Sequence, residues 1–290
     1  MAEFWDAVLF GIVEGITEWL PISSTGHMIL LDEFVKLDVS PEFLEMFLVV
    51  IQLGAILAVV LLFWKQIWPF GRKDNHNPVG KQGVLAWCKK DIWLLWFKII
   101  AACLPAAVVG ILFDEYFESL FYNSVCVALA LIVFGVGFLI IENKNKGMRP
   151  KINSLGQITY RTALIIGLFQ LIAAIFPGTS RSGATILGAL LIGVSRTVAA
   201  EFTFFLAIPV MFGASLLKMM KFGFSFTGNE VMILATGMLT AFLVSVLVIK
   251  FLMGYIKKHD FKVFGWYRIA LGVLVLLYFG LAGGNTIYWE

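Results

Sequence analysis

Residues 14–27 read EGITEWLPISSTGH and interrupt an apolar segment that extends over residues 4–37. A proline removes a backbone donor and ends a helix, whereas serine and threonine side chains cap the start of the next one. The pattern therefore predicts two short helices joined by a turn, in place of one spanning helix. A second apolar segment, residues 160–194, is interrupted in the same way by residues 177–185, PGTSRSGAT.

The composition indicates a polytopic membrane protein. Of the 290 residues, 60% are hydrophobic and only 14% are charged, which lies outside the range of ordinary soluble domains. Six uninterrupted apolar runs are each long enough to cross about 30 Å of hydrocarbon. They are residues 43–64, 92–113, 121–141, 197–217, 231–251 and 265–281. We therefore expect an all-α protein with six transmembrane helices plus two broken or re-entrant helix pairs.

Lysine and arginine concentrate in three connections, residues 65–90, 142–161 and 254–264. Cytoplasmic loops carry such an excess, so these three are expected on the cytoplasmic side. The connections 32–42 and 114–120 are poor in basic residues and are expected outside, which makes both termini extracytoplasmic. The net charge of +3 reflects these loops and does not indicate nucleic-acid binding.

The chain contains the interrupted segment twice. A shift of 156 positions places Glu14 on Gln170, Pro21 on Pro177 and Thr25 on Arg181. We interpret the chain as a single membrane domain, residues 1–290, made of two repeats at about 1–141 and 157–290. Three spans separate the two interrupted segments, and this odd number predicts an inverted-topology repeat.

Two carboxylates lie in the apolar helix before the first turn. Glu14 and Glu18 are four residues apart, so on a helix they share one face. Two like charges inside a bilayer need a proton or a bridging cation, and Mg²⁺ or Ca²⁺ is the usual cation with oxygen ligands. We favour a divalent cation held by Glu14 and Glu18. His27, just past the turn, is a candidate general base, nucleophile or leaving-group acid.

Both turns are candidate phosphate sites, because hydroxyls and the free N–H groups of a helix start bind anions. The first turn offers Ser23, Ser24, Thr25 and Gly26, and the second offers Thr179, Ser180, Ser182 and Thr185. Arg181 could hold two phosphate oxygens bidentately, or could form a structural ion pair with Glu14 or Glu18. Arg268, within the last span, is expected to extend its charge to the interface.

These two motifs resemble the signature motifs of the undecaprenyl-diphosphate phosphatase family, the bacterial membrane lipid phosphatases linked to bacitracin resistance. The resemblance covers nearly the whole chain, including residues 45–60, EMFLVVIQLGAILAVV. It implies an enzyme of the bacterial plasma (inner) membrane that needs Mg²⁺ or Ca²⁺. Such an enzyme hydrolyses undecaprenyl (C55 polyprenyl) diphosphate to undecaprenyl phosphate and inorganic phosphate, which recycles the lipid carrier for peptidoglycan synthesis.

Carried over by position, the resemblance implies an acidic pair, a catalytic loop and a phosphate-binding side. These are Glu14 and Glu18, then Ser24, Thr25 and His27, then Ser180, Arg181 and Thr185. The residues do not choose between Ser24, His27 and water as nucleophile. From the loop charges, we expect the crevice to open to the extracytoplasmic side.

The alternative function is a transporter or flippase of polyprenyl phosphate or another anion, since inverted repeats with broken helices are typical of transporters. Small-residue faces such as Ala184 with Gly188 could pack helices within the chain or between copies in a homo-oligomer. The asymmetry of the two copies favours chemistry over transport, because only the first has the acidic pair and the histidine.

Overall fold

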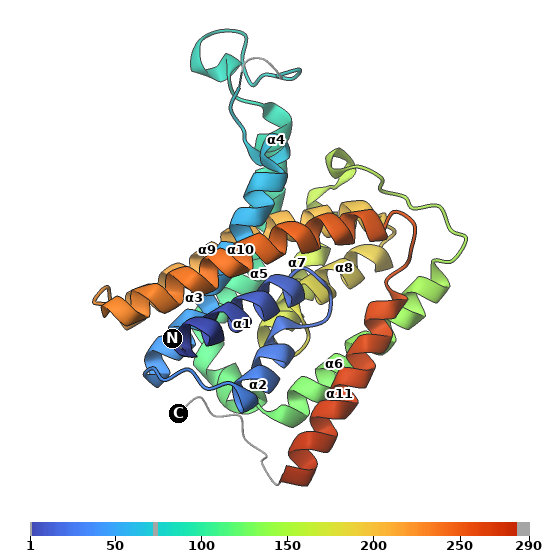
Figure 1. The fold of residues 1–290 in the computed structure, drawn as a ribbon. Coiled ribbons are helices and arrows are strands. Elements are labelled where there is room, and N and C mark those ends of the chain that lie inside the picture. The colour runs from blue at the N-terminus through green and yellow to red at the C-terminus, as the bar shows by residue number, and fades with distance from the viewer. Residues whose placement is uncertain (1, 72–74, 283–290) are drawn as a thin grey trace.

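The structure is a computed structural model that describes residues 2–71 and 75–282. In this part of the chain the regular elements are helices, with three isolated backbone bridges and no β-strand (Figure 1). Six of these helices are long and apolar enough to cross a membrane, as the hydropathy of the sequence predicts. They are α3 (Pro41–Leu62), α5 (Lys90–Phe121), α6 (Ser124–Lys144), α9 (Arg196–Phe222), α10 (Gly228–Tyr255) and α11 (Lys262–Ala282).

Both predicted breaks are present. The first interrupted segment forms α1 (Ala2–Thr17) and α2 (Ser24–Phe34), and the second forms α7 (Tyr160–Ile175) and α8 (Arg181–Leu191). Helix α1 ends four residues before Pro21, at the residue whose carbonyl a proline ring would strike in a continuing helix. The remaining elements are short: α4 (Trp64–Ile67), η1 (Gly83–Ala86) and η2 (Leu155–Gln157).

Residues 114–120, predicted to be a connection between spans, are helical, because α5 continues through Phe121. Their placement on the outer side stays a prediction. Hydropathy marks where a chain leaves the apolar layer, whereas glutamate and leucine favour helix on either side of that boundary. The connection to α6 is therefore short. It ends at Asn123, whose side-chain oxygen accepts a hydrogen bond from the N–H of Cys126 at 2.8 Å and caps α6.

The two turns have the same unusual backbone. Ser23 and Ser180 have φ values of 76° and 69°, and within the described residues no other non-glycine residue has positive φ. Each side chain caps its helix by accepting from the N–H three residues on, that of Gly26 at 3.3 Å and that of Gly183 at 3.1 Å. Equivalent serines thus lie 157 positions apart, since two residues separate Pro177 from Ser180 and one residue separates Pro21 from Ser23. The predicted match of Arg181 with Thr25 is wrong, because Arg181 matches Ser24.

The first helix of each broken pair packs on a spanning helix of the other repeat. Helix α1 lies against α10, and α7 lies against α5, while α3 contacts α9 and α6 contacts α11 (Figure 1). Glycines permit these crossings: a Cβ at Gly167 would lie 2.3 Å from the carbonyl oxygen of Ala102. In each repeat, the first broken helix thus packs on a spanning helix of the other repeat, as expected for a duplicated chain. The opposite membrane orientation of the two repeats stays a prediction.

The small-residue face of α8 is used inside the chain. Ala184 is fully buried, and a Cβ at Gly188 would lie 2.5 Å from the ring of Phe169 on α7. The close approach of α7 and α8 therefore accounts for this face without a second copy of the protein.

Candidate active site

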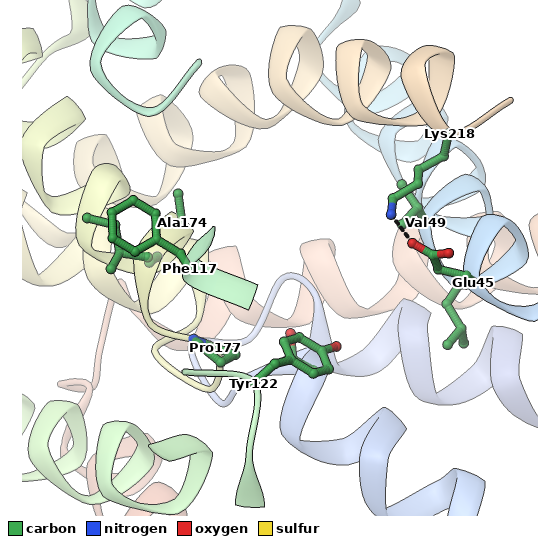
Figure 2. A pocket seen from close by; sticks show the side chains of 11 residues that line it. Glu45, Val49, Phe117, Tyr122, Ala174, Pro177 and Lys218 are labelled. Atoms are coloured by element: carbon green, nitrogen blue, oxygen red, sulfur yellow. Dashed lines mark hydrogen bonds and ion pairs between the residues drawn. The ribbon is translucent and has the colours of Figure 1, made fainter. Parts of the chain in front are cut away.

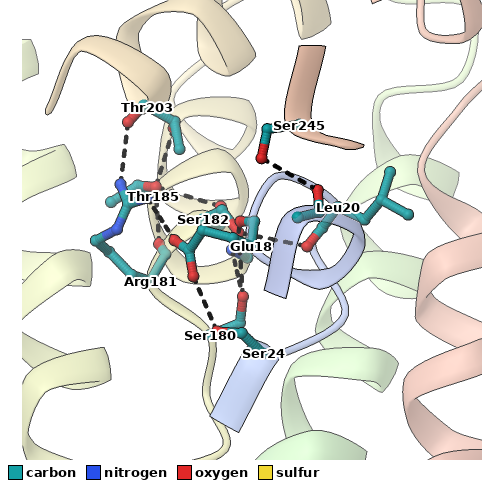
Figure 3. Close-up of polar contacts among 11 residues, drawn as sticks. Glu18, Leu20, Ser24, Ser180, Arg181, Ser182, Thr185, Thr203 and Ser245 are labelled. Atoms are coloured by element: carbon teal, nitrogen blue, oxygen red, sulfur yellow. Dashed lines mark hydrogen bonds and ion pairs between the residues drawn. The ribbon is translucent and has the colours of Figure 1, made fainter. Parts of the chain in front are cut away.

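Glu18 is the centre of a polar cluster between the two turns (Figure 3). Its Oε1 accepts a hydrogen bond from Nη2 of Arg181 at 2.8 Å, and its Oε2 accepts one from Oγ of Ser24 at 2.9 Å. The carboxylate and the guanidinium are only 6% and 13% exposed. Three residues singled out by the sequence are thus in direct contact, although 163 positions separate Glu18 from Arg181.

A second bond crosses between the turns at the same place. Oγ of Ser182 donates to the backbone carbonyl of Glu18 at 3.0 Å, a group left without a helical partner where α1 ends. Ser180 lies beside it, with its Oγ 3.2 Å from that of Ser182. The hydroxyls of Ser180 and Ser182, expected to bind substrate, therefore also shape the turn and join it to the first one.

Arg181 is oriented from behind by α9. Its Nη1 donates to the carbonyl oxygen of Thr203 at 3.1 Å, and Oγ1 of Thr203 donates to Oγ1 of Thr185 at 2.9 Å. Thr185 in turn donates to the carbonyl of Arg181 at 2.9 Å. Thr185, predicted to bind phosphate, thus supports Arg181 in this structure. Thr203 was missed, since a single threonine in an apolar span carries no signal in the sequence.

Several buried polar atoms of the two broken helix pairs and the second turn have no hydrogen-bond partner among the described residues. They include Oε1 of Glu14, both amide atoms of Gln170, Oγ1 of Thr179 and Nε of Arg181. Gln170 interacts with the thiol of Cys103, and Glu14 interacts electrostatically with both Glu18 and Arg181. Buried polar groups are normally paired, so a concentration of unpaired ones is suited to a polar ligand.

The same atoms bear on the predicted cation. Among the described residues no group of three or more histidine, cysteine, aspartate and glutamate side chains could hold a metal, so Glu14 and Glu18 alone do not complete a site. Oxygen atoms of Gln170 and Thr179 are also buried and unpaired, and hard cations such as Mg²⁺ and Ca²⁺ take carboxylate, amide and hydroxyl oxygens. The residues present fit such an ion once phosphate oxygens supply further ligands.

His27 is placed apart from Glu18 and Arg181. Its Nδ1 lies 2.7 Å from the carbonyl oxygen of Ser23, and its Nε2 lies 2.7 Å from the hydroxyl of Tyr267. A carbonyl only accepts, so Nδ1 of a neutral ring carries the hydrogen and Nε2 accepts from Tyr267. The two rings are stacked with their centroids 5.6 Å apart. Both ring nitrogens thus have protein partners.

Arg268 was expected at the interface, and that expectation is wrong. The residue is fully buried beneath both turns. Its Nη1 donates to the carbonyl of Pro21 at 3.3 Å, and its Nη2 donates to those of Gly178 and Thr179 at 3.1 and 2.7 Å. Because a turn inside a membrane leaves carbonyls without helical partners, they need such a donor. The guanidinium fork satisfies the two turns together.

A cavity of about 280 Å³ adjoins the two turns (Figure 2). It is lined by Thr25 and Pro177 from the turns, by apolar side chains that include Phe117 and Ala174, and by Glu45 and Lys218. The Lys218 ammonium forms an ion pair with the Glu45 carboxylate. Thr25, one of the predicted loop residues, therefore faces a space with an apolar side and a charged side, which suits an amphiphile.

The fold and the site define a class, namely a multi-pass membrane protein with a buried polar centre between two broken helix pairs. Comparison with known families narrows the class. The family described as Bacitracin resistance protein BacA matches residues 7–274, and this chain belongs to that family.

Curated relatives cover nearly the whole chain. An undecaprenyl-diphosphatase of Desulfitobacterium hafniense is 67% identical over 279 residues, which are 96% of this chain and 97% of the relative. Undecaprenyl-diphosphatase 1 of Clostridium acetobutylicum is 62% identical over 277 residues, again 96% and 97%. An undecaprenyl-diphosphatase of Enterococcus faecalis is 59% identical over 275 residues, 95% of this chain and 96% of the relative. The family suggested by the two motifs is confirmed.

Proposed function

We propose that this chain hydrolyses undecaprenyl diphosphate to undecaprenyl phosphate and inorganic phosphate. The observation that carries the proposal is the contact of Glu18 with both Ser24 and Arg181, which joins an acid, a hydroxyl and a guanidinium inside an apolar bundle. The relatives named undecaprenyl-diphosphatase, at 59–67% identity in the three cases described, support the same substrate. The product serves as lipid carrier for peptidoglycan synthesis.

Ser24 is the nucleophile that the geometry favours. Its hydroxyl already donates to Oε2 of Glu18, so Glu18 can take the proton as Oγ attacks the terminal phosphorus. The bond from that phosphorus to the bridging oxygen breaks, and undecaprenyl phosphate leaves. Water then attacks the phosphoserine, which releases inorganic phosphate and frees Ser24. His27 is less suited to attack, because Tyr267 and the Ser23 carbonyl engage its two nitrogens.

Arg181 changes partner in this scheme. Without substrate it pairs with Glu18, the structural alternative for this residue. A phosphate with two free oxygens is a bidentate match for the guanidinium, so the terminal phosphate draws Arg181 away and leaves Glu18 free to accept the proton. Ser180, Ser182 and the N–H groups at the start of α8 would bind the same anion.

Glu14, with Glu18 and the unpaired oxygens of Gln170 and Thr179, would hold a divalent cation, Mg²⁺ or Ca²⁺. Such an ion supplies charge neutralisation of the diphosphate and of its leaving group. The apolar side of the cavity at Phe117 and Ala174 suits the first isoprene units of the lipid.

We infer that the site opens to the extracytoplasmic side of the bacterial plasma membrane, with both termini on that side. The cavity lies where α3 begins and α9 ends, next to the base-poor connection at residues 32–42. The three spans between the two broken pairs, α3, α5 and α6, support an inverted relation of the two repeats. Association into a homo-oligomer has no support from the α8 face, which is used within the chain.

The decisive experiment measures inorganic phosphate release from undecaprenyl diphosphate by the purified protein in detergent. Ser24→Ala, Glu18→Gln and Arg181→Ala should each lower the rate about 100-fold or more, since general-base and positioning groups contribute that much. Matched changes at exposed positions, Ser119→Ala, Glu33→Gln and Arg161→Ala, should leave it unchanged. Chelator should abolish release in the unaltered protein, and added Mg²⁺ or Ca²⁺ should restore it.

A denaturing quench during turnover identifies the nucleophile. With substrate labelled in the terminal phosphate, acid-stable label should appear on Ser24. Label that survives only in alkali would point to His27, and the absence of label to water. A folded protein that releases no phosphate but moves polyprenyl phosphate across proteoliposomes would replace the enzyme with the transporter that its broken helices also suit.

A further inference from the structure

A second cavity lies at the other end of α9 from the cavity beside the two turns. It has a volume of about 500 Å³ and is lined at α9 by Arg196, whereas the cavity at the turns is lined at α9 by Lys218. Lys218 lies 22 positions after Arg196, which corresponds to about 33 Å along a helix. Helix α6 supports the same placement, because it contributes its last turn, near Glu142 and Lys144, to this second cavity.

The lining of this cavity is strongly basic. Five cationic side chains line it, from the end of α6, the following loop, the start of α9 and the end of α10: Lys144, Arg149, Lys151, Arg196 and Lys257. The one lining acid, Glu142, is fully enclosed, and Arg196 donates to its two oxygens at 2.9, 3.2 and 2.5 Å. Glu142 therefore balances Arg196 and leaves four cations uncompensated within the lining.

Two further acids lie just beyond the lining. Asp260 interacts with Arg196, and Glu201 interacts with Lys257. Asp260 is also paired with Lys262 at 3.5 Å. With both acids included, the cations of the lining still exceed the carboxylates by five to three, so the cavity keeps a positive field.

Hydrogen bonds between distant segments hold the walls in place. The N–H of Lys151 donates to the carbonyl of Gly193 at 2.8 Å, and the N–H of Ser195 donates to that of Ile152 at 2.9 Å. Nδ2 of Asn145 donates to the carbonyl of Leu190 at 3.1 Å. The cavity is thus built into the fold. The first turn of α9 opens into it and adds the positive end of a 27-residue helix.

Exposed apolar side chains border the cationic ones. Met148 is 62% and Leu191 is 46% exposed, and both line the cavity. A ligand that satisfies both parts has an anionic head and an apolar tail. Basic pockets at the ends of transmembrane helices bind lipid head groups for this reason. We propose that this cavity binds the phosphate group of an anionic membrane lipid, at a site separate from the two turns.

Loop charges that set membrane orientation offer a simpler explanation of the basic residues. That rule requires positive charge in the loops and does not require side chains from four segments to converge on one cavity. If general loop charge were sufficient, removal of lysines from another basic loop should weaken lipid binding equally. If the cavity is a specific site, only removal of its own lysines should do so.

Native mass spectrometry of the purified full chain in detergent tests the proposal. The probes are phosphatidylglycerol, dioleoylglycerol as the same tails without phosphate, and inorganic phosphate alone. The variant Lys144→Gln/Lys151→Gln/Lys257→Gln removes three lining charges. The control Lys65→Gln/Lys81→Gln/Lys90→Gln removes three exposed charges from the connection between α3 and α5. The lining variant should weaken phosphatidylglycerol binding about tenfold or more, and the control should not.

Each other result overturns the assignment. Equal loss of phosphatidylglycerol binding in the lining and control variants would indicate an effect of general surface charge. Dioleoylglycerol binding as strong as that of phosphatidylglycerol would indicate an apolar groove. Binding of inorganic phosphate without the lipid would make this a free-anion site. Phosphate release from undecaprenyl diphosphate should be unchanged in the lining variant, because its residues line a cavity that shares no lining residue with the cavity at the turns. A negative lipid-binding result would therefore leave the proposed phosphatase activity unaffected. A loss of phosphatase activity in the Ser24, Glu18 or Arg181 variants would likewise leave the lipid-binding proposal unaffected.

Discussion

Arg268 carries a charge in the middle of the molecule and is held by carbonyl oxygens rather than by a carboxylate. Its hydrogen-bond acceptors come from α6 and from both turns. Arginine presents several donors in a rigid fork, whereas lysine presents a compact point charge. At the residue scale, we therefore expect Arg268 to act as a positioning residue that sets the distance between the two turns.

Replacement of Arg268 should separate this role from a general loss of stability. Arg268→Lys keeps the charge but cannot reach Pro21, Gly178 and Thr179 together, so kcat for phosphate release should fall about tenfold or more while KM changes little. Arg268→Met leaves buried carbonyls unpaired, each costing about 1–3 kcal/mol, and should also lower the melting temperature. Lys98→Met, which removes another cation from a span, serves as control. Equal kinetics of Arg268→Lys and the unaltered protein would contradict the assignment.

The contacts of Arg268 show why part of the site could not be predicted. Its partners Pro21 and Thr179 lie 247 and 89 positions away, and no local pattern signals such a distance. Glu18, Ser24 and Arg181 could be predicted, because each lies in a short motif that places a charge or hydroxyl beside a break in an apolar helix. The arrangement among them depended on how the two turns meet, which the sequence does not contain.

At the scale of elements, the breaks and spans could be predicted and the helix ends could not. A proline beside hydroxyl residues is a local signal, and so is an apolar run of membrane length. The end of α5 has no such local signal, because residues that favour helix continue beyond the apolar run. The tight crossing of α7 and α5 was likewise not predictable, since it depends on which glycine faces which carbonyl.

The crossing of α7 and α5 provides a test of packing. A Cβ at Gly167 would lie 2.3 Å from the carbonyl oxygen of Ala102, so Gly167→Ala should force the helices apart and destabilise the protein by about 1–3 kcal/mol. Gly110→Ala, also on α5, meets open space and should be neutral or stabilising, because alanine favours helix over glycine. Thermal unfolding in detergent measures both. An unchanged melting temperature for Gly167→Ala would show that this crossing is looser than described.

At the scale of the whole molecule, the proposed orientation can be tested in cells. In a chain with Cys88, Cys103 and Cys126 replaced by alanine, single cysteines are placed at the exposed positions Glu42 and Lys146. A membrane-impermeant maleimide should label position 42 in intact cells, and position 146 only after permeabilisation, because basic loops are retained in the cytoplasm. The opposite pattern would turn the site to the cytoplasmic side and reverse both termini.

The bonds that complete the site run from one half of the chain to the other. Glu18 receives Arg181, Ser182 reaches the carbonyl of Glu18, and Arg268 reaches Pro21. The first half holds Ser24 and Glu18, whereas Arg181, Ser182 and Arg268 come from the second half. A chain whose halves fail to dock should therefore be inactive. Two separately expressed halves would regain activity only by finding each other in the bilayer, so that turnover itself would report their assembly.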